Sequence, residues 1–183
     1  MDLLDQLQQS FAMTTAIVDG ITPAQLSLPT PCDDWNVSRL LSHTIGVLDA
    51  FAVREPNPFA AARLEDDFAA QFSASATAAL AAWRAPGALD GVVARPGRPP
   101  MPWSVFAGIN LVDTFTHAWD LAQATGQQPK IDEDLARDCL AMAQRVIPDD
   151  ARAIVGFKPA QNPVPSQSAS AQLAAFLGRA TPT

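Results

Sequence analysis

Apolar residues recur at spacings of three and four along most of this chain, and this periodicity constrains the fold more than any other feature. Because an α-helix has 3.6 residues per turn, such a stripe lies along one helix face. The stripe of the first predicted helix, residues 2–18, is Leu3, Leu7, Phe11, Thr14 and Val18. The same spacing predicts helices over residues 36–51, 64–83, 103–125 and 132–146, and a short final helix over 171–177. Abundant alanine and leucine, with no tyrosine, also favour helix over sheet.

Turn-forming residues separate these helices. Gly20 ends the first helix, and Thr22-Pro-Ala-Gln25 is typical of a capping box that opens one short turn. Residues 85–102 are rich in proline and glycine, so we expect a loop there, with a short extended piece over 89–94. The chain is again rich in proline over residues 148–170. The sequence therefore predicts an all-α bundle of four long helices, with short extra helices and long connecting loops.

Length and charge narrow the function classes. A chain of 183 residues fits one domain, residues 1–183, with a core large enough to fold without disulfides or structural metal. Twelve basic against nineteen acidic residues give a formal charge of −7 and no basic cluster, which argues against nucleic acid and anionic membranes as partners. No apolar run reaches the roughly 18 residues of a membrane span, and the N-terminus lacks the pattern of an export signal. We expect a soluble cytoplasmic protein.

The chain contains only two histidines, His43 and His117. His117 lies four residues after Asp113 within a predicted helix, so the carboxylate and the imidazole project from one face, one turn apart. His43 lies beside the apolar stripe of another predicted helix. Two facing helices could supply these three side chains to one metal ion, and three protein ligands leave room for a water or substrate.

Other interpretations of the same residues are equally simple. Asp113 and His117 could form an ordinary helix-surface pair, and His43 could lie at the edge of the core. Asp120 lies one turn beyond His117. It could orient a metal ligand without binding the ion itself, or it could form a helix salt bridge. The two acidic residues after Cys32 should raise the pKa of its thiol, which disfavours a nucleophile there. Cys139 is placed as a small core residue, and no CxxC pattern exists, so we expect reduced thiols.

Two segments resemble the signatures of the DinB-like metal-binding four-helix superfamily, in the branch of the mycothiol-dependent maleylpyruvate isomerase metal-binding domain. They are PTPCDDWNVSRLLSH, which ends at His43, and DTFTHAWDLAQATG, which begins at Asp113. The tail SASAQLAAFLGR, residues 168–179, is similar to the short helical end of that branch. The resemblance implies a DinB-like helical domain with His43, Asp113 and His117 as metal ligands. The isomerases typically have glutamate at the acidic position, whereas this chain has the shorter aspartate.

The resemblance also implies a chemistry. The expected ion is zinc, although nickel or manganese would fit the ligands. An open position on the ion could bind mycothiol as a thiolate and present it to an electrophilic small-molecule substrate, as in a thiol-dependent transferase or isomerase. The isomerases carry an additional C-terminal domain for which this chain has no room, which weighs against maleylpyruvate isomerisation itself. The alternatives are a non-catalytic metal-binding or small-molecule-binding bundle and a metal-dependent hydrolase. A second copy of the chain, in a homodimer, is a further candidate partner.

Overall fold

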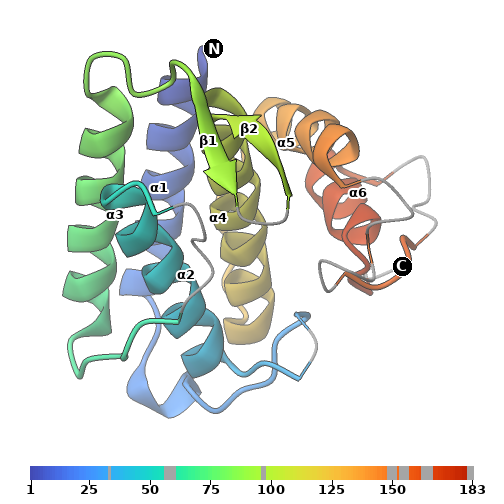
Figure 1. Ribbon diagram of the computed structural model, residues 1–183. Coiled ribbons are helices and arrows are strands. Elements are labelled where there is room, and N and C mark those ends of the chain that lie inside the picture. Colours follow the sequence, from blue (N-terminus) through green and yellow to red (C-terminus); the bar gives the residue numbers. More distant parts are fainter. Residues whose placement is uncertain are drawn as a thin grey trace.

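The fold is a helical bundle in which four long helices lie side by side, with a two-stranded hairpin and two further helices packed around it (Figure 1). The computed structural model describes residues 1–32, 34–55, 61–95, 98–147, 152, 157–161 and 167–180. Within this part of the chain the elements are, in order, α1 (Leu3–Asp19), η1 (Pro23–Gln25), α2 (Val37–Ala52), α3 (Phe68–Arg84), β1 (Val92–Arg95), β2 (Arg98–Pro102), α4 (Trp103–Thr125), α5 (Glu133–Val146) and α6 (Ala169–Phe176). This architecture confirms the predicted all-α class.

Short polar side chains fix where the helices begin. Asp2, Asn36, Asp132 and Ser168 each accept a hydrogen bond from a backbone N–H of the first turn of α1, α2, α5 and α6. Gly126 ends α4 with φ of 71°, a left-handed conformation that favours glycine. These boundaries agree with the predicted ones to within two or three residues.

One predicted helix boundary and one predicted loop were wrong. The third helix was expected from residue 64, but Asp67 caps it and α3 begins at Phe68. The proline-rich stretch was expected to be a loop with one extended piece, but β1 pairs with a second strand, β2, in an antiparallel hairpin. Proline is tolerated in β2 because a two-stranded hairpin leaves each strand with a free edge. Most of the loop predicted over residues 148–170 lies outside the described residues.

Helix α4 is the centre of the molecule. It packs against α1, α2, α5 and α6 and also contacts β2, so its side chains are buried around most of its circumference. The core that surrounds it is formed by large apolar side chains from several helices, among them Leu7, Phe11, Leu40, Leu41, Ile45, Leu48, Phe51, Phe72, Trp83, Leu111 and Phe115. Because α4 is enclosed in this way, a polar side chain on its middle turns is shielded from water and is stabilised by a partner inside the protein.

One such polar residue is Asn110. Its side chain is fully buried, and its Oδ1 accepts a hydrogen bond of 3.0 Å from the indole Nε1–H of Trp83 on α3. The large Trp83 ring can therefore be buried without leaving its N–H unsatisfied.

No described helix combines the length and the apolar character that a membrane-spanning helix needs.

Candidate metal centre

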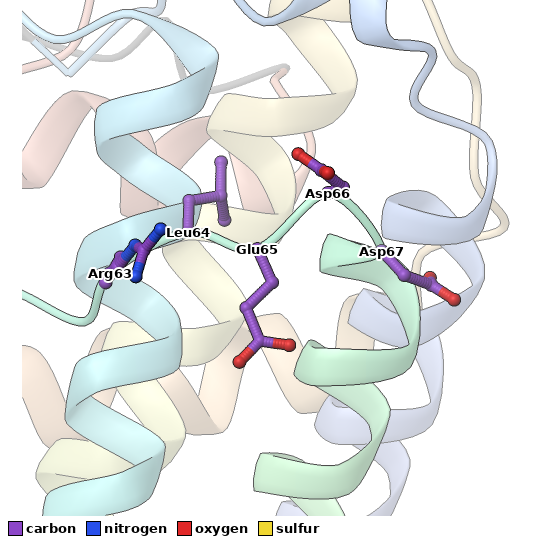
Figure 2. Close-up of a pocket in the computed structure, with 5 residues that line it drawn as sticks. All are labelled: Arg63, Leu64, Glu65, Asp66 and Asp67. Atoms are coloured by element: carbon purple, nitrogen blue, oxygen red, sulfur yellow. The ribbon is translucent and has the colours of Figure 1, made fainter.

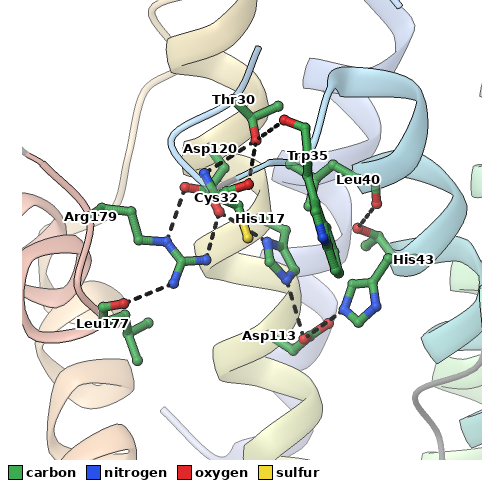
Figure 3. Close-up of polar contacts among 11 residues, drawn as sticks. Thr30, Cys32, Trp35, Leu40, His43, Asp113, His117, Asp120, Leu177 and Arg179 are labelled. Carbon is green, nitrogen blue, oxygen red and sulfur yellow. Dashed lines mark hydrogen bonds and ion pairs between the residues drawn. The ribbon is translucent and has the colours of Figure 1, made fainter. Parts of the chain in front are cut away.

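The two histidines and Asp113 meet between α2 and α4 (Figure 3). Asp113 and His117 lie one turn apart on the same face of α4, as their spacing predicts. His43 lies on α2, which packs against α4 and turns this side chain towards the same point. Asp113 Oδ1 lies 3.3 Å from His43 Nε2 and 3.5 Å from His117 Nε2. Residues 70 positions apart in the sequence thus share one carboxylate oxygen.

These distances fit the requirements of a metal ion. Ligand atoms arranged tetrahedrally at about 2.0–2.1 Å from zinc lie about 3.3–3.4 Å from one another. The two contacts of Asp113 are close to that value, and one ligand atom from each of the three residues lies within 4.8 Å of the others. Asp113 Oδ2 is buried and has no hydrogen-bond partner among the described residues. A buried carboxylate oxygen without a partner is costly, and a bound cation would satisfy it.

The cluster is partly accessible from outside. The side chains of His43 and Asp113 are 12% and 14% exposed, while His117 is 8% exposed. Trp35 covers the two histidines, with its ring centroid 4.9 Å from that of His43 and 6.2 Å from that of His117. The loop that carries Trp35 is closed by Thr30, whose backbone N–H and hydroxyl both donate to the Trp35 carbonyl.

Opposite charges hold the cluster together. Burial alone would raise the pKa of the Asp113 carboxyl, but the charge of His117 and hydrogen bonds with both histidines hold that pKa well below its usual range. Burial alone would lower the pKa of His117, but the charge and hydrogen bond of Asp113, with those of Asp120, raise it to about 9. Without an ion, His117 is therefore protonated at neutral pH. A metal ion that binds Nε2 must displace a proton.

Asp120 extends the cluster away from α2. Its fully buried side chain contacts His117 Nδ1 through Oδ2 at 3.0 Å, on the ring atom opposite to the one that faces Asp113. Arg179 reaches the same carboxylate from the segment after α6, with Nη2 2.9 Å from Oδ2 and Nε 3.3 Å from Oδ1. The hydrogen bond from His117 and the charge of Arg179 overcome the effect of burial and keep the pKa of Asp120 low. This contact is compatible with both roles considered for Asp120, a residue that orients His117 and a helix ion pair.

Sequence reasoning missed Arg179. It lies 59 residues from Asp120, and the local sequence gave no sign of which partner it would find. Its only sequence signal is its position at the end of the tail that resembles the superfamily, and no role was assigned to it there.

Of the cysteines, Cys139 is buried in the core on α5, and burial raises the pKa of its thiol to about 12, which makes it the inert core residue that was predicted. Cys32 lies near His117 and Asp120, where it forms a second group of three metal-ligating side chains within 4.8 Å of one another. The sequence did not predict this second group. The two cysteines are not joined in a disulfide.

Two surface pockets lie elsewhere. One of about 450 Å³ is lined by Arg63, Leu64 and three acidic residues of the segment that leads into α3, as Figure 2 shows. The other, of about 250 Å³, lies between α1, α4 and α5 and includes Leu111 and Met142 in its lining. Neither pocket is lined by His43, Asp113 or His117.

Comparison with known proteins places the chain in a family. A family model described as the mycothiol maleylpyruvate isomerase N-terminal domain matches residues 7–122, a range that includes His43, Asp113, His117 and Asp120. Two proteins of Mycobacterium tuberculosis, from strains CDC 1551 / Oshkosh and ATCC 25618 / H37Rv, are each 33% identical to this chain over 180 residues, and each match covers 98% of both chains. Both are named uncharacterized proteins. No solved structure matches the chain. The helical fold and the match over most of the bundle lead to one conclusion: this chain belongs to the mycothiol maleylpyruvate isomerase N-terminal domain family.

Proposed function

We propose that His43, Asp113 and His117 bind one divalent metal ion, and that the protein uses this ion in a mycothiol-dependent transfer or isomerisation of a small electrophilic molecule. The observation that carries the proposal is the convergence of the three side chains around Asp113, with the buried Oδ2 of that carboxylate left without a hydrogen-bond partner in the described part of the chain. Zinc is the ion that suits two imidazoles and one carboxylate best, and nickel or manganese would also fit.

Each residue has a defined task in this proposal. When bound, the ion would supply an open coordination position at which a thiol ionises, together with a positive charge that polarises the electrophile. His43 and His117 present their Nε2 atoms from two helices that are packed together, so the ligand positions are set before binding. Asp120 accepts a hydrogen bond from His117 Nδ1–H, which keeps Nε2 directed towards Asp113.

Further features support the proposal. The matched family is described by its relation to mycothiol maleylpyruvate isomerase, so a low-molecular-weight thiol is the natural co-substrate to test first. We propose the cytoplasm as the compartment, because the two cysteines lie far apart in the sequence and match no CxxC pattern, so reduced thiols are expected. Helix α6 packs against α5 and α4, which supports residues 1–183 acting as one domain.

Cobalt(II) provides the decisive experiment, because its absorption reports both its ligands and their changes. Protein loaded with cobalt should contain about one ion per chain, and His43→Ala and Asp113→Asn should each lose most of it. Asp138→Asn is the matched control, since this exposed carboxylate on α5 accepts only from Gln6 among the hydrogen bonds described for it. If the wild type bound no cobalt, nickel or zinc after loading, the metal proposal would be wrong.

Adding mycothiol tests the open position. A thiolate on cobalt gives a sulfur-to-metal charge-transfer band in the near ultraviolet, which we expect in the wild type and equally in a Cys32→Ser/Cys139→Ser variant. The cysteine-free variant excludes a sulfur ligand from the chain. If no low-molecular-weight thiol changed the spectrum while cobalt stayed bound, thiol chemistry would be refuted, although metal binding would stand.

One observation favours a second candidate, a non-catalytic metal-binding or small-molecule-binding bundle. Neither of the two pockets above touches the three proposed ligands, whereas an enzyme needs room for a substrate beside its ion. A metal-dependent hydrolase would need the same room. Full metal occupancy, together with no spectral response to thiols or to carboxylate and ester ligands, would favour the non-catalytic bundle.

A further inference from the structure

His117 belongs to two overlapping sets of metal-ligating side chains. The first set is His43, Asp113 and His117, and the second is Cys32, Asp120 and His117. The imidazole can serve both because it has two nitrogens, with Nε2 facing Asp113 and Nδ1 facing Asp120. Each side of the ring therefore has the side chains that could hold a cation, and the surroundings of Asp120 bear on whether the second side is available.

The carboxylate of Asp120 is already paired with the guanidinium of Arg179. Its guanidinium contacts both carboxylate oxygens, through Nη2 at 2.9 Å and Nε at 3.3 Å, in the fork geometry that suits this pair. Both side chains are buried, with Asp120 fully enclosed and Arg179 only 7% exposed. Nη1 of Arg179 also donates to the Leu177 carbonyl at 3.0 Å, which holds the guanidinium in place from its other side.

The turn after α6 aims Arg179 at Asp120. Gly178 has φ of 85°, and a Cβ at this position would lie 2.8 Å from Cβ of Lys158, so the close turn requires glycine. The Arg179 N–H returns to the Ala174 carbonyl at 2.9 Å and closes the turn. Arg179 lies beyond residues 7–122, the range that matches the family domain, so a segment outside that range completes the surroundings of His117.

We propose that Arg179 is a positioning residue that selects between the two ligand sets. By holding both oxygens of Asp120 and placing a fixed positive charge beside Cys32 and His117 Nδ1, it keeps a cation away from the second set. The ion is thereby confined to His43, Asp113 and His117. This inference rests on the proposed metal-binding function of those three residues.

Removing the guanidinium should reverse the selection. Without Arg179, both Asp120 oxygens become available and the repulsion that a cation would feel at this point disappears. The Cys32 thiol would lose its proton to the buffer on coordination, and the resulting thiolate is a ligand that cobalt and zinc bind well. An Arg179→Ala variant should therefore bind its ion at the sulfur-containing set.

The test compares cobalt(II) spectra without any added thiol. Wild-type protein should show visible cobalt absorption but no sulfur-to-cobalt band in the near ultraviolet. Arg179→Ala should gain that band, and Arg179→Ala/Cys32→Ser should lose it again. Arg179→Lys, which keeps the charge but not the fork, should show a weaker band than Arg179→Ala.

Arg152→Ala is the matched control for general loosening of the C-terminal segment. Arg152 is a buried arginine that donates to the Phe176 carbonyl at 2.7 Å and is not a member of either ligand set. This variant should keep the wild-type spectrum. If Arg179→Ala did not fold, Arg179→Gln would serve for the same comparison, since glutamine also removes the charge and the fork.

The outcomes separate this inference from the function on which it rests. Failure of the wild type to bind cobalt would overturn the metal proposal and this inference with it. If the wild type binds cobalt, an unchanged spectrum in the Arg179 variants, or loss of cobalt from them, would overturn the inference alone. A sulfur band in the wild type that disappears in Cys32→Ser would also overturn it, because the second set would then be used with Arg179 present.

Discussion

Replacing Arg179 with alanine should lower the free energy of unfolding of the metal-free protein by about 3–5 kcal/mol, the usual cost of breaking a buried ion pair from one side. Asp120 is fully buried and Arg179 is 7% exposed, so the remaining carboxylate cannot turn to water. His117, 3.0 Å from Asp120 Oδ2, still offers a partial counter-charge, so we expect the lower end of this range. For a chain of this size, that loss corresponds to a fall in Tm of roughly 6–12 °C.

A double-mutant cycle measures the pair itself. Arg179→Ala, Asp120→Ala and the double variant should be unfolded in urea after chelation and followed by far-ultraviolet circular dichroism. The double variant should lose less free energy of unfolding than the two single variants lose together, by about 1–3 kcal/mol, because removing both partners leaves neither charge buried alone. Unfolding must be shown to be two-state before the free energies are compared.

The exposed pair Arg137 and Asp134 on α5 is the control within the same chain. These side chains are 61% and 83% exposed, so Arg137→Ala should cost below ~1 kcal/mol, since water screens the pair. A loss of unfolding free energy in Arg179→Ala no larger than that in Arg137→Ala, or simple additivity of the two substitutions in the buried pair, would contradict the prediction. Either result would mean that Asp120 finds another partner as readily as Arg179.

Three further predictions concern the metal centre. Chelation should leave the far-ultraviolet circular dichroism of the helices intact, because the apolar core is sufficient for folding. Metal at a hundredfold excess over its Kd should then add about 2.7 kcal/mol to the free energy of unfolding by linkage. Loss of most of the helical signal on chelation would instead identify a structural ion. In chelated protein, the pKa of His117 is raised from 6.5 to about 9, so its contribution to stability is fully present below about pH 6.5 and is lost as the pH rises towards 9. Tm measured across this range should fall in the wild type and stay flatter in His117→Asn. Trp35 lies 4.9 Å from the His43 ring, so binding of copper(II) or cobalt(II) should quench a component of tryptophan fluorescence that is absent in Trp35→Phe; equal quenching in that variant would place the ion elsewhere.

The sequence by itself determined most of the helices and the pairing of Asp113 with His117 on one helix face. Three-and-four spacing depends only on the chain's own helical geometry, so the apolar stripes predicted α1, α2, α4 and α5. The same geometry placed Asp113 and His117 on one face of α4. The apolar stripe of α2 left His43 open between a metal ligand and a core-edge histidine, and the family resemblance favoured the metal ligand.

The tertiary structure decided everything that depends on two segments meeting. The second strand of the hairpin, β2, was not predicted. Strand pairing is a contact between two segments, and neither segment shows a periodic pattern that would indicate it. His43 reaches Asp113 across 70 residues only because α2 packs against α4. Arg179 reaches Asp120 only because Gly178 turns the chain after α6 back towards α4. Helix periodicity is a local property and can be read from the chain, whereas the partner of a buried charge is chosen by packing between distant segments.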